Sequence, residues 1–263
     1  MSKLVKALFF DIDGTLVSFK THHIPLSTIQ AIKQAKDKGV GIYISTGRPK
    51  AIISNLSDID DLIDGYITAN GAYCFVGDKE VSCHSIPSKD VKLVLEQARN
   101  HHFACVVVGT RHLCVYQQDE TFNRIFLDLL QVKGFEKAVS LDKILEEPIL
   151  QLSPFVTFAQ EQKLMPMLHS CLSGRWHPEF IDITSKLADK GQGLQSVANF
   201  LGLPMSQVMA FGDGGNDISI IRKAGIGVAM GNAVAELKEA ADYVTSSVDE
   251  DGIRKALEYY HVI

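Results

Sequence analysis

Two aspartates separated by one residue follow an apolar run near the start of the sequence. Residues 4–16 read Leu-Val-Lys-Ala-Leu-Phe-Phe-Asp-Ile-Asp-Gly-Thr-Leu, which places Asp11 and Asp13 directly after the run and before Gly14. Because ligands of open α/β sheets bind at the carboxyl ends of the strands, two carboxylates at the exit of a buried strand are candidates for chemistry. A simple turn, in which Asp13 caps a chain reversal that Gly14 permits, accounts for one of these acids but not for both.

A second acidic segment has the same organisation. Residues 207–217 read Gln-Val-Met-Ala-Phe-Gly-Asp-Gly-Gly-Asn-Asp, a short apolar run followed by Asp213, Asn216 and Asp217. Taken alone, this segment is also compatible with a solvated acidic turn that caps a helix. Because ligands of open α/β sheets bind at the carboxyl ends of the strands, we expect the two acidic segments to meet at one edge of a sheet.

Short apolar strands alternate with helical patterns at both ends of the sequence. This alternation predicts parallel strands joined by right-handed crossovers, and therefore a Rossmann-like α/β sheet. The predicted strands are residues 4–10, 40–45, 65–69, 207–211, 226–229 and 242–245. The predicted helices are residues 27–38, 49–57, 190–201, 215–224, 233–241 and 250–260.

The middle of the sequence has a different pattern. Residues 72–86 predict a β-hairpin. Beyond it, the predicted helices are 88–101, 119–131 and 160–171, and the predicted strands are 104–108, 112–117, 150–158 and 179–184. This block is most simply an α+β domain inserted into the first domain. We therefore predict a discontinuous core domain, residues 1–82 and 188–263, and an inserted cap domain, residues 83–187.

Composition narrows the class of protein. The chain has 263 residues, of which 46% are hydrophobic and 22% charged, as in a globular protein with a sizeable core. A formal net charge of −5 gives no basic footprint for nucleic acid. The five cysteines are an odd number without a Cys-x-x-Cys pair, which indicates reduced thiols. No signal-peptide core or membrane span is evident, so we expect a soluble cytoplasmic protein that binds no membrane.

Five motifs in this order resemble the haloacid dehalogenase (HAD) superfamily, and within it the Cof-type sugar-phosphate phosphatases. They are Asp11-Ile12-Asp13-Gly14-Thr15, Ser45-Thr46-Gly47-Arg48, Asn70-Gly71, Lys190-Gly191 and Gly212-Asp213-Gly214-Gly215-Asn216-Asp217. The resemblance implies a HAD core with a large cap of the C2B type. It also implies a Mg²⁺-dependent phosphomonoesterase that acts on a small phosphorylated metabolite, such as a sugar phosphate, through an aspartyl-phosphate intermediate.

The resemblance also implies roles for the acidic residues. Asp11 matches the nucleophile of the family, and Asp13 matches the general acid that protonates the leaving oxygen and later activates water. The implied ligands of Mg²⁺ are the carboxylate of Asp11, the main-chain carbonyl of Asp13 and the carboxylate of Asp213. Asp217 is implied as a neighbour that orients these ligands, and Asn216 as a contact of the phosphate.

Further residues are candidates for contacts with the phosphate. Thr46 ends the run Ile-Tyr-Ile-Ser-Thr and precedes Gly47, so its hydroxyl and the neighbouring amides could hydrogen-bond a phosphate. Thr46 matches the family's phosphate-binding position, although such a motif taken alone is more often an ordinary helix cap. Lys190 begins a helix, which is an unfavourable place for a cation unless an anion lies nearby. It matches the family's lysine, and Lys186 is its rival. Candidate substrate contacts are Arg48, Asn70, Trp176 and His177.

Two other functions remain open from the sequence. A phosphohexomutase on the same scaffold would need the aspartyl phosphate to survive until a sugar reorients. A non-catalytic regulatory module would use the acceptor aspartate with Mg²⁺ for switching, and the presence of Asp13, a leaving-group acid that such a module does not need, argues against it. The sequence specifies neither the ester nor the oligomeric state, for which we expect a monomer or a weak homo-oligomer.

Overall fold

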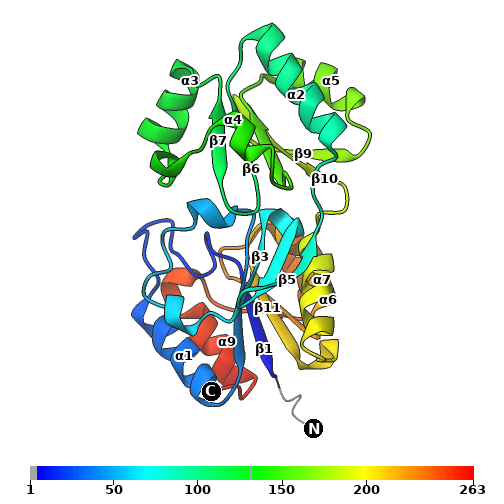
Figure 1. The fold of residues 1–263 in the computed structure, drawn as a ribbon. Helices are drawn as coiled ribbons and strands as arrows, with labels where there is room; N and C mark the ends of the chain where they lie inside the picture. Colours follow the sequence, from blue (N-terminus) through cyan, green and yellow to red (C-terminus); the bar gives the residue numbers. More distant parts are fainter. Residues whose placement is uncertain (1–4, 131) are drawn as a thin grey trace. The chain divides into compact units, whose positions relative to one another are not determined.

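The computed structural model describes residues 5–130 and 132–263, and these divide into two compact units. The first unit comprises Met1–Gly47, Asn55–Ser82 and Asp189–Ile263, and the second comprises Arg48–Ser54 and Cys83–Ala188. The chain therefore leaves the first unit and returns to it, as Figure 1 shows. The second unit includes a short segment, Arg48–Ser54, that lies outside the block 83–187 of the sequence-based assignment.

A mixed sheet of eight strands forms the centre of the first unit, in the order β13-β12-β11-β1-β2-β3-β4-β5. The strands are β1 (Ala7–Phe10), β2 (Gly41–Ser45), β3 (Gly65–Thr68), β4 (Tyr73–Val76), β5 (Lys79–Cys83), β11 (Val208–Gly212), β12 (Ile226–Ala229) and β13 (Tyr243–Val244). All pairings from β13 through β3 are parallel, and β4 is antiparallel to β3. The expected α/β class with a parallel sheet is thus confirmed.

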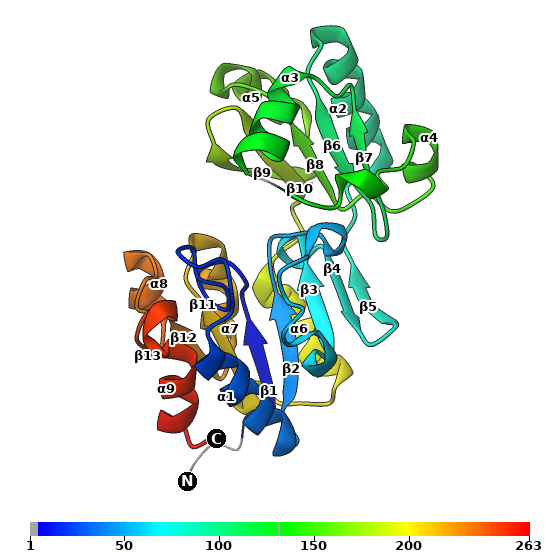
Figure 2. The same ribbon diagram turned by 90° about the vertical axis from the view of Figure 1, so that its left-hand side faces the viewer.

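Helices cover both faces of this sheet (Figures 1 and 2). They are α1 (Leu26–Asp37), α6 (Lys190–Phe200), α7 (Ile218–Lys223), α8 (Ala235–Ala240) and α9 (Gly252–Tyr259). On one face, Leu194 of α6 and Ile220 of α7 pack in one cluster with Phe9 of β1. Helix α1 packs with α9 on the other face. Because the central strands are buried on both faces, their sequences are nearly continuous apolar runs.

The second unit is built on an antiparallel sheet in the order β7-β6-β8-β10-β9. Its strands are β6 (Cys105–Val108), β7 (Leu113–Tyr116), β8 (Gln151–Pro154), β9 (Cys171–His177) and β10 (Phe180–Ser185). Its helices are α2 (Ser88–His101), α3 (Glu120–Phe122) with the π-helix Asn123–Leu129 that continues it, α4 (Leu141–Ile144) and α5 (Phe158–Leu164). Phe122, Phe126, Phe155 and Phe180 form an aromatic cluster within one of its two cores.

Two predicted helices are wrong in extent. Within residues 49–57 the structure has only a 3₁₀ turn, Lys50–Ile52, because the β-branched and Ser/Asn residues that follow Pro49 favour helices weakly. The helix predicted at 160–171 is α5, which ends at Leu164 and continues only as a 3₁₀ turn that contains Pro166. The strand β9 that follows was missed, because its Ser-Gly-Arg centre has no apolar alternation.

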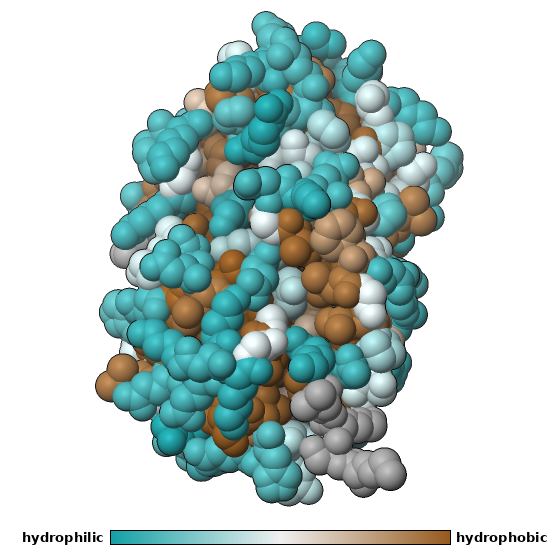
Figure 3. Space-filling model, turned by 60° about the horizontal axis from the view of Figure 1, so that its bottom comes forward, coloured by the Kyte–Doolittle hydropathy of each residue, from teal (hydrophilic) through white to brown (hydrophobic). Residues whose placement is uncertain are grey.

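Two expectations from composition can be compared with the described chain. None of the five cysteines, all of which lie in the described ranges, forms a disulfide. The helices of the described residues are too short or too polar to cross a membrane. Apolar side chains reach the surface in several places among polar ones on the face in Figure 3, and scattered exposure of this kind is usual for folded proteins.

Candidate active site

The candidate site lies at the carboxyl ends of the central parallel strands. Strand β1 has β11 on one side and β2 on the other, so the chain order reverses at β1. Ligands of open α/β sheets bind at such a switch point. Asp11 follows β1 and Asp213 follows β11, while Thr46 and Asn70 follow β2 and β3. The prediction that the two acidic segments share one edge of a sheet is thereby met in the structure.

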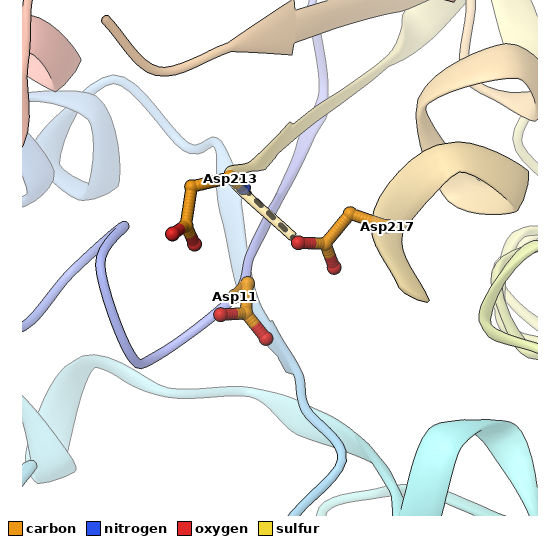
Figure 4. A group of neighbouring side chains, drawn as sticks. All are labelled: Asp11, Asp213 and Asp217. Carbon is orange, nitrogen blue, oxygen red and sulfur yellow. Dashed lines mark hydrogen bonds between the residues drawn. The ribbon is translucent and has the colours of Figure 1, made fainter. Parts of the chain in front are cut away.

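Three carboxylates gather at this edge. Asp11, Asp213 and Asp217 each offer one oxygen atom, and these atoms all lie within 4.8 Å of one another. Figure 4 shows the carboxylates of Asp11 and Asp213 turned toward a common space, with Asp217 beside them. Asp13 is half-buried, and its charge acts on Asp213. The two acidic segments, about 200 residues apart in sequence, therefore form one electrostatic group.

Lys190 is the cation bonded to this group. Its Nζ donates to Oδ1 of Asp11 at 2.7 Å and to Oδ1 of Asp217 at 2.6 Å, and the residue is only 1% exposed. It is the first residue of α6, whose N-cap is Asp189. Gly191 allows α6 to approach closely, because a Cβ there would lie 2.6 Å from the carbonyl oxygen of Ser219. The rival Lys186 is exposed and belongs to the second unit.

The turn after β1 is fitted to the second acidic segment. Gly14 has φ +85°, and a Cβ at this position would collide with the carboxylate of Asp213. Thr15 donates from Oγ1 to Oδ1 of Asp213 at 3.0 Å. Gly14 is required here both by its backbone conformation and by the close approach of the two loops. Thr15 therefore supports the site through Asp213.

Asp217 is held by the protein at both of its oxygen atoms. Oδ2 accepts hydrogen bonds from the backbone N–H groups of Asp213 and Gly214, both at 3.0 Å, while Oδ1 accepts from Lys190. Asp217 thus fixes the loop that carries Asp213 and also orients Lys190. This arrangement agrees with an orienting role better than with direct ligation of a metal ion.

The side of the site that faces β2 and β3 carries neutral polar groups. Thr46 is buried, and its carbonyl oxygen accepts from the backbone N–H of Asn70 at 3.1 Å. Asn70 adopts the left-handed conformation, with φ 54°, and its Oδ1 accepts from Nδ2 of Asn216 at 3.1 Å. A Cβ on Gly47 would lie 3.1 Å from the same Oδ1. The structure thus brings Thr46, Gly47, Asn70 and Asn216 together.

Three other candidate residues belong to the second unit. Arg48 lies in its short segment Arg48–Ser54. His177 stacks on Phe180, with ring centroids 5.2 Å apart, and its Nδ1 accepts from the backbone N–H of Glu179 at 3.2 Å. The side chain of Trp176 lies outside the part of the chain that the structure describes. Substrate contacts by these three residues remain predictions.

The sequence analysis missed one residue at the site, Asn232. Its Nδ2 donates to the carbonyl oxygen of Gly14 at 2.8 Å, and its Oδ1 accepts from the backbone N–H of Val248 at 3.0 Å. Its position was the available signal, because it follows β12, which is parallel to β11 and ends at the same edge of the sheet.

Burial and mutual repulsion shift the pKa values of the carboxyl groups. Burial raises the pKa of Asp11 to about 8, which Lys190 opposes and the charge of Asp217 reinforces. Burial and then the charge of Asp217 raise the pKa of Asp213 to about 6, although the hydrogen bond from Thr15 opposes this shift. Burial disfavours the charge of Lys190, but Asp11 and Asp217 outweigh it and raise the pKa of the lysine.

The donor set fits a small divalent cation. Carboxylate oxygens are the hard ligands that Mg²⁺ prefers. Asp11 and Asp213 each offer such an oxygen atom, and these two atoms lie within 4.8 Å of each other (Figure 4). Oδ1 of Asp213 accepts its hydrogen bond from Thr15, a neutral partner. Burial, reinforced by the charge of Asp217, raises the pKa of both Asp11 and Asp213, so their ionised forms are disfavoured unless a further cation lies nearby. Bound Mg²⁺ would supply the missing positive charge.

This fold and this group of residues define a hydrolase of one family. The family model of haloacid dehalogenase-like hydrolases matches residues 8–257, so the chain belongs to that family. It is a phosphatase of this family, a hydrolase that acts on phosphate esters. The resemblance inferred from the sequence motifs is confirmed.

Individual relatives agree with this assignment. The chain is 31% identical over 256 residues to the 5-amino-6-(5-phospho-D-ribitylamino)uracil phosphatase YcsE of Bacillus subtilis (strain 168), covering 97% of this chain and 96% of the relative. The structure of the HAD subclass IIB sugar phosphatase BT4131 is 47% identical, covers 98% of this chain and 100% of its own, and gives a TM-score of 0.86. The phosphatase BT1666 from Bacteroides thetaiotaomicron is 37% identical, with coverage of 100% and 97% and a TM-score of 0.85.

Removal of the buried cation should destabilise the first unit. Lys190→Met leaves Asp11 and Asp217 buried without their common partner, and breaking a buried ion pair in this way costs about 3–5 kcal/mol. We expect a loss of this size in the free energy of unfolding, measured in urea at pH 8 without metal. Lys186→Met, at an exposed position, should change it by less than about 0.5 kcal/mol. Equal losses in the two variants would contradict the assignment.

The metal-free protein should lose stability as the pH rises. The folded-state pKa values of Asp11 and Asp213, about 8 and about 6, lie above their ordinary value of 3.8. The folded state therefore binds more protons than the unfolded state between these values, and the free energy of unfolding falls as the pH rises from about 4 to about 8. Urea unfolding in the presence of chelator should show this fall relative to Asp11→Asn, which has no carboxyl group to ionise at that position. A difference that is constant with pH would refute it.

Proposed function

We propose that this chain is a Mg²⁺-dependent phosphomonoesterase that hydrolyses a sugar phosphate or a similar small ester through a phosphorylated Asp11. The observation that carries the proposal is the convergence of Asp11, Asp213 and Lys190 at the switch point of the sheet. A relative described as a sugar phosphatase, 47% identical over nearly the whole chain, supports the choice of substrate class.

In the first step a carboxylate oxygen of Asp11 attacks the phosphorus atom and forms a P–O bond. The bond from phosphorus to the ester oxygen breaks, and this oxygen takes a proton from the carboxyl group of Asp13. The alcohol departs and leaves an acyl phosphate on Asp11. In the second step the carboxylate of Asp13 removes a proton from water and the water oxygen bonds to phosphorus. The bond from phosphorus to the oxygen of Asp11 breaks, which releases inorganic phosphate and the free carboxylate of Asp11.

The remaining residues position the reacting groups and neutralise their negative charge. Lys190 holds one oxygen of Asp11 and directs the other toward the phosphorus atom. In this proposal Thr46 and Asn216 donate to the phosphoryl oxygens, together with the backbone at Gly47. Asp11, the carbonyl of Asp13 and Asp213 would hold Mg²⁺, which supplies positive charge against the repulsion between carboxylate and phosphate.

The second unit, in this proposal, determines which ester is accepted. The residues assigned to chemical steps, namely Asp11, Asp13, Lys190 and Asp213, all belong to the first unit. A separate α+β domain that covers the leaving group would let binding energy from the sugar order the site and exclude water. Specificity and chemistry would then reside in different parts of the chain.

Replacement of the attacking carboxylate should abolish turnover. Asp11→Asn keeps the size of the side chain but removes the nucleophile, so we expect phosphate release to fall by more than about 10³-fold. Asp37→Asn, at an exposed position of α1, is the matched control and should retain full activity.

Wild-type activity should disappear on chelation and return with Mg²⁺, and Ca²⁺ should replace Mg²⁺ poorly. Near wild-type turnover by folded Asp11→Asn, or full activity after exhaustive chelation, would exclude the mechanism.

Exchange of the inserted block should change the substrate preference without changing the dependence of catalysis on Asp11. We expect a chimera that carries residues 83–187 of a relative with a different preference to follow the donor's ranking over a panel of phosphate esters. Asp11→Asn in the chimera should still abolish phosphate release. A folded chimera with the original ranking would place specificity in the loops of the first unit instead.

A further inference from the structure

The loop between β12 and α8 joins several parts of the candidate site through its backbone. The N–H of Met230 donates to the carbonyl of Gly212 at 3.0 Å, and that of Val234 donates to the carbonyl of Asp213 at 3.0 Å. The N–H of Gly231 donates to the carbonyl of Ser246 at 3.0 Å. This loop is therefore fixed both to the second acidic segment and to the segment that precedes α9.

Asn232 extends from this loop to the turn that carries the first acidic pair. Its Nδ2 donates to the carbonyl oxygen of Gly14 at 2.8 Å, and its Oδ1 is held by the N–H of Val248 at 3.0 Å. The N–H of Gly14 in turn donates to the carbonyl of Val17 at 2.9 Å. Both polar groups of Gly14, the residue after Asp13, are thus fixed by hydrogen bonds.

A second attachment holds the same segment at a greater distance from Asp13. Ser18 donates from Oγ to Oδ1 of Asp249 at 2.6 Å, and Lys20 pairs with Oδ2 of Asp249 at 3.1 Å. Asn232 and Asp249 therefore anchor residues 14–20 to the carboxyl-terminal part of the first unit, in addition to the bond from Thr15 to Asp213. Only the attachment through Asn232 is made to the residue next to Asp13.

We propose that Asn232 is a positioning residue for the general acid: it holds the turn after Asp13 at the carbonyl of Gly14, so that the carboxyl proton of Asp13 lies in line with the departing oxygen. The inference rests on the proposed function, in which Asp13 donates that proton. Without the bond from Nδ2, the turn keeps its backbone hydrogen bonds to Ile12 and Val17, but the carbonyl of Gly14, a residue with no side chain to restrain it, is released. Asp11, Asp213 and Lys190 keep their own hydrogen bonds. The N–H of Gly14, which is in the same peptide group as the carbonyl of Asp13, keeps its bond to Val17, so attack and charge neutralisation persist.

The leaving group distinguishes this role from a merely structural one. A sugar alkoxide departs slowly without a proton, whereas a nitrophenolate departs readily as the anion. The quantity to compare is kcat/KM, which covers the steps up to release of the alcohol and excludes hydrolysis of the phosphoenzyme. A misplaced acid should lower kcat/KM for a hexose phosphate far more than for para-nitrophenyl phosphate.

The test measures kcat/KM for both esters with Mg²⁺ in wild type, Asn232→Ala, Asn232→Asp and Asp13→Ala. We expect both Asn232 variants to lose about 10²-fold on the hexose phosphate and less than about threefold on the aryl ester, because general acid catalysis typically contributes at least 10²-fold. Asp249→Ala, which removes the attachment at Ser18 and Lys20, is the matched control for a loosened loop. Any change in kcat/KM that it causes should be of the same size for both esters.

The outcomes separate the inference from the function on which it rests. An equal loss on both esters, or no loss, in the Asn232 variants overturns the positioning role if Asp13→Ala does separate them. The same selective loss in Asp249→Ala also overturns it, because loosening of the loop at any point would then be sufficient. If Asp13→Ala fails to separate the esters, or wild type cleaves neither, the proposed function itself is wrong.

Discussion

The ion pairs of Lys190 with Asp11 and Asp217 are the interaction on which the rest of the site depends. A fully buried ammonium group is stable only beside anions, and buried carboxylates close together need a cation in return. One lysine at the start of α6 thereby joins the loop after β1 to the loop after β11. Since Asp217 also accepts from the backbone of Asp213, the pairing sets the shape of the whole acidic group.

The approach of the elements around Lys190 is a steric consequence of small residues. Gly14 leaves room for the carboxylate of Asp213, and Gly191 lets α6 lie against the backbone of Ser219. Larger side chains at these positions would separate the loops and weaken their charge interactions, which fall with distance. The glycines of the acidic and lysine motifs thus serve the electrostatics of the site as much as the turns in which they occur.

The sequence predicted the parallel sheet and the meeting of Asp11 with Asp213, because apolar runs that end in acids are local signals and parallel order follows from alternation with helices. It could not predict β9, whose place is determined by pairing with β10, or the short turn after Pro49. Asn232 also escaped prediction: an asparagine after a strand is common, and only the fold brings it to Gly14. The roles of Trp176 and His177 as substrate contacts stay predictions.

The wide separation of β1 from β11 in the sequence has a consequence for biosynthesis. Ala7 pairs with Val208, so the central strand lacks one neighbour until most of the chain has left the ribosome. Pairings this distant in sequence slow folding and leave apolar strand edges exposed meanwhile. Most of the second unit, Cys83–Ala188, is synthesised before β11 and can collapse earlier. Hydrolytic competence is then acquired late, when β11 enters the sheet and delivers Asp213 to a partner made long before.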